Sequence, residues 1–185
     1  MKRWAGLLLC WPLAGVADER ALAQVMRSLA AVPAVEAAFR EEKTLAVLDA
    51  PLVTTGVLYY RAPDFLRKRT LHPHPEDYEA DANWLTVETP EAGRRQFDLN
   101  GYPQLRPFVE AIRATQAGDQ AALARYYRLE FQGTPADWSL RLTPHDADAQ
   151  RYVAAIVLRG QNGRIDRMET LEPDGDRSVM TITPR

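Results

Sequence analysis

The chain has 185 residues, of which 46% are hydrophobic and 26% are charged, a composition typical of one soluble globular domain with a substantial core. Its formal net charge of −2 lacks the basic surplus that nucleic-acid-binding domains usually carry. Acidic and basic residues are interspersed throughout, so the sequence contains no charged tail that would need a partner of opposite charge.

The first residues predict a secretory signal peptide. Lys2 and Arg3 form a positive n-region, residues 5–13 form an apolar h-region, and the small residues 15–17 form a cleavage site. This apolar stretch is too short to span a membrane, and no later stretch is long or apolar enough to do so. We therefore expect cleavage after Ala17, which leaves one mature domain over residues 18–185.

The mature domain is expected to contain no thiol, because the only cysteine, Cys10, lies inside the signal peptide. Leu9, directly before it, is a poor fit to the small residue that precedes a lipid-anchoring cysteine. The sequence thus predicts a domain without disulfides or cysteine-bound metal. We expect this domain to reside in the periplasm of a Gram-negative bacterium.

After the signal peptide, the sequence predicts a helix and then a long extended run. Asp18 can cap a helix whose apolar residues recur at spacings of three and four, namely Leu22, Val25, Met26 and Leu29. Val32 and Pro33 end this helix. Residues 35–48 then predict an extended segment that carries Phe39 and is broken at Ala50 and Pro51.

A β-hairpin is predicted next, over residues 56–61 and 65–71. Leu58 and Tyr60 share one face of the first strand, which is the two-residue alternation of a half-exposed strand. Pro63 and Asp64 turn the chain, because proline fixes its own φ and favours extended geometry in the residue before it. The hairpin therefore has one apolar and one polar face.

The middle of the chain predicts further strands and then two helices. Residues 72–75 form a rigid connector with two prolines, and strands follow from Tyr78, over residues 84–88 and over residues 94–99. Residues 103–115 predict a helix with Phe108 and Ile112 on its apolar stripe. Residues 117–119 end it and cap a short second helix through Leu123 to Tyr126.

The last third is again rich in strands, which are predicted over residues 127–131, 138–142, 152–158, 164–171 and 178–183. The Asn162–Gly163 pair is a strong hairpin signal. The whole pattern amounts to about ten strands and two or three helices, without an internal repeat or a linker. It predicts one α+β domain in which helices pack on one face of a large antiparallel sheet.

No arrangement of residues indicates catalysis or metal binding. His72 and His74, with Glu76 and Asp77 nearby, could share a face, but His145 is the only further imidazole, so a surface connector is the favoured interpretation. The serines at 28, 139 and 178 lack the sharp glycine-flanked turn of a nucleophile. Residues 174–176 lack the glutamate spacing of a calcium loop, and no glycine-rich phosphate cradle is present. We expect no enzymatic activity, no metal and no cofactor.

Besides the motifs considered above, the sequence has a surplus of apolar residues that bears on function. Each of them could belong to an ordinary core. A strongly curved sheet under loosely packed helices would instead leave an apolar cavity that suits an acyl chain or another hydrophobic ligand.

Four segments resemble the LolA family of periplasmic outer-membrane lipoprotein carriers. They are the run from Gly56 to Arg67, the helix over residues 18–32 before Phe39, the segment Trp138–Pro144 and the turn Gly160–Ile165. They follow the family's order over nearly all of the mature chain, and the turn at residues 117–119 is more similar to a LolA-related branch than to the dedicated carrier. Members of that branch are often associated with the export of lipid-like or aryl-polyene-type products.

The resemblance implies a half-open, curved antiparallel β-barrel, α+β in class, with helices as a lid over a hydrophobic cavity. It further implies that ligand-binding residues from the barrel and the lid surround the acyl chains. By position these residues are Phe39, Leu58, Tyr60, Leu66, Phe108, Ile112, Trp138, Leu140 and Leu142.

One position departs from the family pattern. The family carrier has an arginine immediately before the proline of the first hairpin, where it ties the lid to the barrel, but this chain has Ala62 there. Arg61 stands one position earlier and is expected on the opposite face. The departure bears on whether the lid opens and closes in the same way.

The resemblance favours a passive carrier that takes a lipoprotein or lipid-like product from an inner-membrane donor protein to an outer-membrane acceptor protein. We expect such a carrier to act as a monomer. A second hypothesis is a periplasmic sensor or scaffold that binds lipid or polypeptide and reports to a membrane partner. A hydrolase ranks last.

Overall fold

The computed structural model describes residues 14–102 and 104–185, so most of the predicted signal peptide lies outside the described residues. Four helices and eleven strands follow one another in these residues. In chain order they are α1 (Ala14–Ala30), β1 (Ala34–Thr44), β2 (Leu52–Arg61), β3 (Phe65–His72), β4 (Glu76–Asp81), β5 (Trp84–Thr89), β6 (Gly93–Asp98), α2 (Arg106–Gln116), α3 (Gln120–Tyr126), β7 (Tyr127–Thr134), β8 (Asp137–Pro144), α4 (Ala147–Gln150), β9 (Ala155–Gln161), β10 (Arg164–Leu171) and β11 (Arg177–Pro184).

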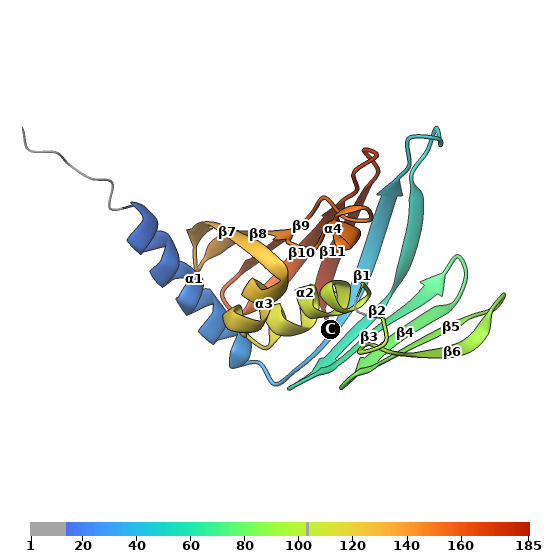
Figure 1. Ribbon diagram of the computed structural model, residues 1–185, viewed down its shortest axis with the longest axis horizontal. Helices are drawn as coiled ribbons and strands as arrows, with labels where there is room; N and C mark the ends of the chain where they lie inside the picture. The colour runs from blue at the N-terminus through green and yellow to red at the C-terminus, as the bar shows by residue number, and fades with distance from the viewer. Residues whose placement is uncertain (1–13, 103) are drawn as a thin grey trace, which may run out of the picture.

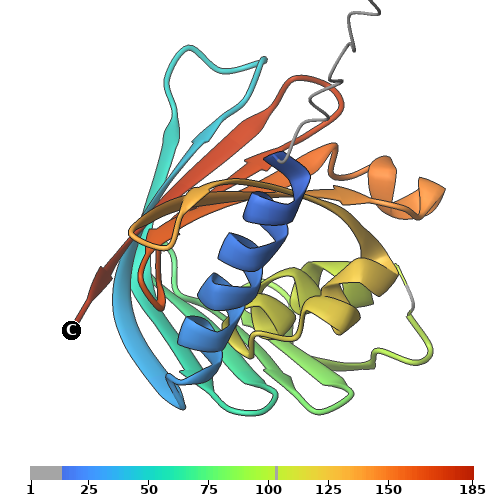
Figure 2. The same cartoon turned by 90° about the vertical axis from the view of Figure 1, so that its left-hand side faces the viewer.

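All eleven strands form one antiparallel sheet in the order β6-β5-β4-β3-β2-β1-β11-β10-β9-β8-β7. The sheet curves around α1, α2 and α3 without closing, so β6 and β7 remain as its two edges (Figure 1; Figure 2). This arrangement confirms the predicted α+β class with a half-open antiparallel barrel and helices on its inner side. The pairing of β1 with β11 joins the two ends of the chain in the middle of the sheet.

The first hairpin forms as predicted, with Tyr60 opposite Leu66 and Leu58 opposite Lys68. A glycine is required at position 56, where β2 passes close to two neighbours. A Cβ atom there would lie 2.0 Å from the Arg69 carbonyl oxygen and 2.7 Å from the Phe39 ring. Leu58 and Tyr60 follow Gly56 at spacings of two and four residues along β2. They therefore lie on the same face of the strand as Gly56, which is the concave face of the sheet.

Several boundaries differ from the sequence-based expectations. Helix α1 begins at Ala14, so Asp18 lies inside the helix and does not cap its start. Strand β1 ends at Thr44 and residues 45–51 form the connection to β2, so the strand ends earlier than the extended segment predicted over residues 35–48. Helix α4 lies between the strands predicted over residues 138–142 and 152–158 and was not predicted; it is a single turn that begins because the Asp146 carboxylate accepts hydrogen bonds from the backbone N–H groups of Asp148 and Ala149.

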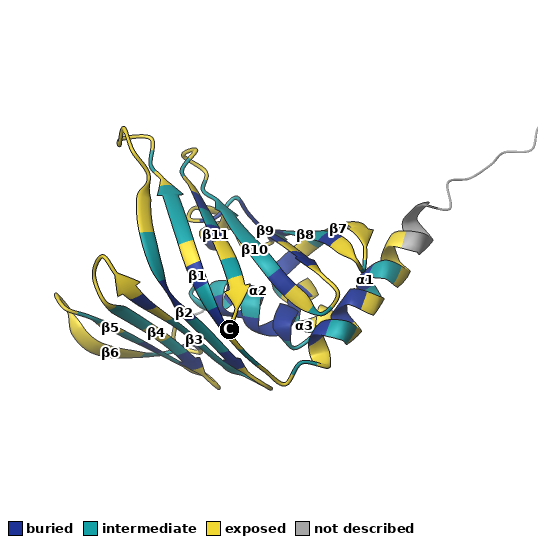
Figure 3. Ribbon diagram, turned by 180° about the vertical axis from the view of Figure 1, so that it is seen from behind, coloured by how far each residue is buried: buried dark blue, intermediate teal, exposed yellow. Residues whose placement is uncertain are grey.

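The main core lies where α1, α2 and α3 pack on β7, β8 and β9 (Figure 3). Leu29 of α1, Leu123 of α3 and Leu142 of β8 are fully buried there. A much smaller cluster of Ala80, Leu99 and Val109 packs the other end of α2 against β4. Helix α2 thus spans the concave side between two packed regions, and the space beneath its middle is less completely filled.

Candidate ligand-binding cavity

Two apolar cavities lie on the concave side of the sheet. The first, about 340 Å³, is walled by β1, β2, the β9–β10 turn and the end of β11, and contains Val35, Tyr60 and Ile182. The second, about 320 Å³, lies between α2 and the strands β2–β5 and β9–β11, and contains Phe108, Leu85 and Met180. Each volume falls within the range of about 300–1,000 Å³ that is typical of ligand sites.

The two cavities share a wall, so they are neighbouring compartments of one hollow. Five side chains line both of them: Leu58, Leu66, Ile112, Ile165 and Ile182. All five are aliphatic, and they come from β2, β3, α2, β10 and β11. A small displacement of these flexible or branched side chains would join the compartments without moving the backbone of the sheet.

Five of the nine residues expected to bind a ligand lie on the walls of these cavities. Leu58, Leu66 and Ile112 line both, Tyr60 lines the first and Phe108 lines the second. Burial raises the pKa of the Tyr60 hydroxyl above its ordinary value. The structure brings these barrel and lid residues together from elements far apart in the sequence.

The other four expected residues do not line either cavity. Phe39 is buried beneath Lys68, whose ammonium lies 5.1 Å from the centre of its ring, so Phe39 supports the floor of the sheet. Trp138, Leu140 and Leu142 are buried in the main core against α1 and α3. Their alternation on β8 correctly indicates an inward face, but the helices pack directly on that face and fill the space.

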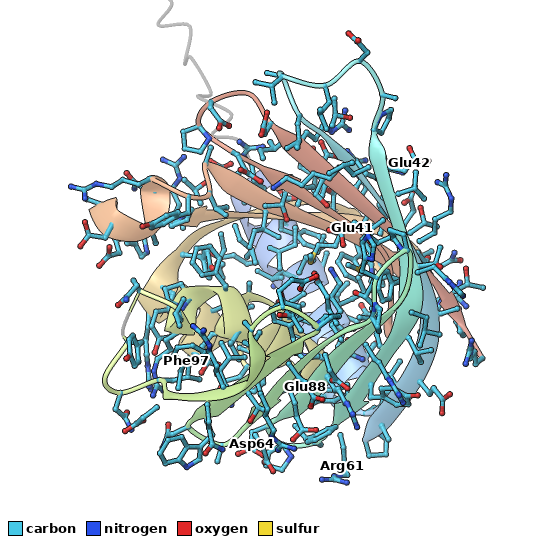
Figure 4. All side chains as sticks on the ribbon, turned by 90° about the vertical axis from the view of Figure 1, so that its right-hand side faces the viewer. Glu41, Glu42, Arg61, Asp64, Glu88 and Phe97 are labelled. Carbon is cyan, nitrogen blue, oxygen red and sulfur yellow. The ribbon has the colours of Figure 1, made fainter. Side chains whose placement is uncertain are left out.

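Polar side chains gather on the concave face beyond the apolar walls. The Lys68 ammonium lies 2.5 Å from Oε2 of Glu41, and the Ser178 hydroxyl donates to Oε1 of the same carboxylate. Burial alone would raise the pKa of Glu41, but the Lys68 charge and the two hydrogen bonds outweigh it and hold that pKa below its ordinary value. Figure 4 shows Glu41 on the inner side of β1 and Glu42 on the outer side.

An arginine of helix α2 ties this helix to the tips of two hairpins. Arg113 is buried and donates to the backbone carbonyl oxygens of Ala82, at 2.7 Å, and of Asp64, at 3.4 Å. Its charge is paired with Glu110 one turn earlier on the helix. Ala82 lies in the β4–β5 turn and Asp64 in the β2–β3 turn, so one guanidinium holds α2 against both.

Arg61, by contrast, lies outside the barrel. Its side chain is exposed on the convex side and rests over the ring of Phe65, with the guanidinium carbon 4.7 Å from the ring centre. The expectation that Arg61 faces away from the lid is confirmed. Arg113 of α2 makes the contact between this helix and the two hairpin turns.

The sequence analysis missed part of the cavity wall. Ile165, Met168, Met180 and Ile182 line it from β10 and β11, and Lys68 lines it from β3. The alternation of the last two strands could have indicated which face each residue occupies. Only the pairing of β11 with β1, however, brings that face next to Leu58.

The histidines considered for a metal site are exposed on the surface. Among the described residues, three carboxylates come close enough together to hold an ion, those of Glu172, Asp174 and Asp176 in the β10–β11 loop. All three already have protein partners, because Glu172 pairs with Lys43, Asp174 accepts from the backbone N–H of Asp176, and Asp176 accepts from the backbone N–H of Ala46. Within the described residues no helix is both long and apolar enough to cross a membrane.

The described structure is similar to several solved structures at low sequence identity. A LolA superfamily protein from Nitrosomonas europaea shares 10% identity over 86% of this chain and 90% of its own, with a TM-score of 0.44. MucB shares 16% identity over 91% of this chain, which spans 57% of MucB, with a TM-score of 0.48. The MucA/MucB complex of Pseudomonas aeruginosa shares 14% identity over 88% of this chain and 55% of the matched chain, with a TM-score of 0.46.

No curated protein sequence matches the chain. The family model described as "outer membrane lipoprotein carrier protein LolA-like" matches residues 14–183, which include the helices and all of the sheet except the last residue of β11. The chain therefore belongs to the LolA-like family of outer-membrane lipoprotein carrier proteins.

Proposed function

We propose that this protein is a periplasmic carrier that holds the acyl chains of a lipoprotein or lipid-like product in its hollow and passes them from the inner to the outer membrane. The observation that carries the proposal is the pair of adjoining apolar cavities under helix α2. Family membership supports the same function. The cleavable signal peptide predicted over residues 1–17 would deliver the chain to the periplasm.

The energetics of such a carrier follow from its apolar walls. Burying a hydrocarbon chain is favourable by about 0.8 kcal/mol for each methylene group, so a few buried methylenes already give appreciable affinity. The periplasm contains no ATP, so the cargo would move passively from a donor protein in the inner membrane to a tighter-binding acceptor in the outer membrane. A hollow of moderate size suits this role, because it holds the chain and still releases it.

Binding of an apolar fluorescent probe tests the proposal. N-phenyl-1-naphthylamine becomes bright in apolar surroundings and carries no charged group. We expect it to bind the wild-type mature domain and to be displaced by lipids, and we expect Leu58→Glu to abolish this binding because it places a charge in both cavities. The matched control is Leu52→Glu on the same strand, since Leu52 is 49% exposed. Equal probe binding by the two folded variants would contradict the proposal.

A sensor or scaffold that contacts a membrane partner is the second candidate. The observation that favours it is the apolar connection between β1 and β2, where Val47 is 87% exposed and Leu48 is 44% exposed. Such a surface suits a protein contact. A carrier transfers bound lipid to an acceptor and a sensor does not, so a transfer assay between purified partners separates the two candidates.

A further inference from the structure

One charged side chain reaches the wall of the second cavity. Among the described residues that line it, Lys68 is the only charged one and Tyr78 is the only other polar one. The two stand directly opposite each other on β3 and β4. An otherwise apolar cavity with two polar side chains on one wall has the usual layout of a site that orients its ligand.

The Lys68 ammonium has hydrogen-bonding capacity left for a guest. It has three donors, and Glu41 is its one hydrogen-bond acceptor among the described residues. Its side chain is 32% exposed, and the Phe39 ring supports its position from the floor of the sheet. The remaining N–H groups are therefore available to an acceptor atom that enters the cavity.

The charge around Lys68 restricts which acceptor fits. Glu41 already balances the ammonium, and its lowered pKa keeps it ionised at neutral pH. Glu76 stands two residues before Tyr78 on β4 and therefore on the same face of that strand. Burial is the larger cause of the raised pKa of Tyr78, and the Glu76 charge adds to it. A free carboxylate would therefore meet two negative charges against one positive charge. A neutral carbonyl oxygen can accept the same hydrogen bonds without that repulsion.

We propose that Lys68, on the cavity wall that it shares with Tyr78, forms a subsite for the neutral carbonyl group of an acyl ester or acyl amide, and that this subsite disfavours free fatty acids. The inference rests on the proposed lipid-binding function, because the subsite acts only on a chain that enters the cavity. The apolar walls select the hydrocarbon chain of the ligand, and the subsite selects the chemical class of its head group.

Three ligands with chains of equal length test the subsite by displacement of N-phenyl-1-naphthylamine at neutral pH. They are 1-lauroylglycerol, which has an ester carbonyl, 1-O-dodecylglycerol, which has an ether in its place, and laurate, which has a free carboxylate. A hydrogen bond from a charged donor corresponds to about a tenfold change in affinity. We therefore expect the wild-type protein to bind the ester about tenfold more tightly than either of the other two ligands.

Variants assign this preference to the subsite. In Lys68→Met the ester and the ether are expected to bind equally, whereas Lys68→Arg keeps the donors and the preference. Glu41→Gln removes one negative charge and is expected to improve laurate binding relative to the ester. Because Lys68→Met leaves Glu41 without its partner, the double variant Glu41→Gln/Lys68→Met provides a version without an unpaired charge.

The outcomes separate this inference from the carrier proposal. If the probe does not bind, or none of the ligands displaces it, the carrier proposal is overturned and the subsite falls with it. If the wild-type protein binds all three ligands equally, or if Lys68→Met keeps the preference for the ester, the subsite alone is overturned. Loss of the preference in both variants that lack Lys68, with continued binding of the ether, supports it.

Discussion

At the scale of single residues, the shape of the hollow depends on paired charges and on close packing as well as on its apolar walls. Glu41 and Lys68 neutralise each other on the concave face, and Gly56 lets Phe39 lie flat beneath them. A side chain at position 56 would collide with both the floor and the neighbouring strand. The shape of the binding surface therefore depends on residues that do not touch the ligand.

Gly56→Ala should destabilise the fold, because the new methyl group would lie 2.0 Å from the Arg69 carbonyl oxygen. We expect the free energy of unfolding to decrease by about 1–3 kcal/mol, the usual cost of overpacking. Chemical denaturation measures this change. Gly101→Ala is the control, since the nearest atom to its added Cβ would be 3.5 Å away. An equal effect of the two substitutions would refute the packing argument.

The ionised form of Glu41 should stabilise the folded state in a pH-dependent manner. Its pKa is lower in the folded than in the unfolded chain, so its contribution is complete above the unfolded value and is lost as the pH falls through the folded one. We expect the difference in unfolding free energy between wild type and Glu41→Gln to shrink as the pH falls from 7 to below about 4. A difference that stays constant over this range would contradict the assignment.

Sequence patterns could predict the direction of a side chain but not what it contacts. Leu58 and Trp138 both show inward alternation on their strands. Leu58 faces a hollow, whereas Trp138 faces α1 and α3, with its ring over Gly160 of β9. The difference comes from where the helices pack, and this is decided by contacts between distant parts of the chain. Arg113 was missed for the same reason, because its acceptors are backbone atoms of remote turns.

At the scale of elements, helix α2 closes the hollow. Ile112 faces both cavities, and Arg113, the next residue, fastens the helix to two hairpin tips. The Tyr127 hydroxyl also donates to the Pro107 carbonyl oxygen at 2.7 Å, and burial raises the pKa of Tyr127. These polar contacts add to the apolar packing of Ala111 and Ala114 in the main core and of Val109 in the smaller cluster. Because α2 covers both cavities, it is the element that we expect to move when a ligand enters.

Weakening the Arg113 contacts should therefore accelerate ligand exchange. We expect Arg113→Met to increase the dissociation rate of N-phenyl-1-naphthylamine about tenfold, because the buried hydrogen bonds from a charged donor are lost. Stopped-flow displacement measures this rate. Arg125→Met on α3 is the control, since Arg125 is exposed. If a folded Arg113→Met variant released the probe at the wild-type rate, α2 would not act as a lid.

Elements were predicted well where local signals are strong and poorly where distant contacts set their ends. The proline at residue 63 indicated the hairpin and the cap at Asp119 indicated α3, and the Asp119 carboxylate accepts from the backbone N–H of Ala122 as a cap should. Helix α2 was predicted from residue 103 but begins at Arg106, with Pro107 in its first turn. The end of β1 at Thr44 and the order of the strands follow from pairing with β11, which lies at the other end of the chain. No local pattern specifies that pairing.

At the scale of the whole molecule, the connection between β1 and β2 stands apart from the hollow. It projects beyond the body of the sheet next to the β10–β11 loop (Figure 1). The backbone N–H of Ala46 donates to Asp176 in that loop at 2.8 Å, so the projection is braced. Its exposed apolar residues are Val47 and Leu48, and Leu52 and Val53 at the start of β2 are exposed next to them. A braced apolar projection suits a protein contact, with the donor or acceptor of a carrier or with the membrane partner of a sensor.

The double variant Val47→Ser/Leu48→Ser should separate binding from transfer. Neither residue lines the cavities, so we expect unchanged affinity for the probe and for 1-lauroylglycerol. Transfer of a bound lipid to the acceptor should become at least several-fold slower, because the contact with the partner would be weakened. A matched change on another exposed surface, Tyr152→Ser, should leave transfer unaffected. Unaltered transfer by the double variant would exclude the projection as a docking surface.

The central claim is that the hollow holds a hydrocarbon chain, and native mass spectrometry of the mature domain purified from the periplasm tests it most directly. We predict that the wild-type protein carries one amphiphile whose fragments contain an acyl group, that 1-lauroylglycerol exchanges with it, and that Leu58→Glu carries none. A folded wild-type protein that carries no adduct, and takes up none when 1-lauroylglycerol is added, would contradict the account.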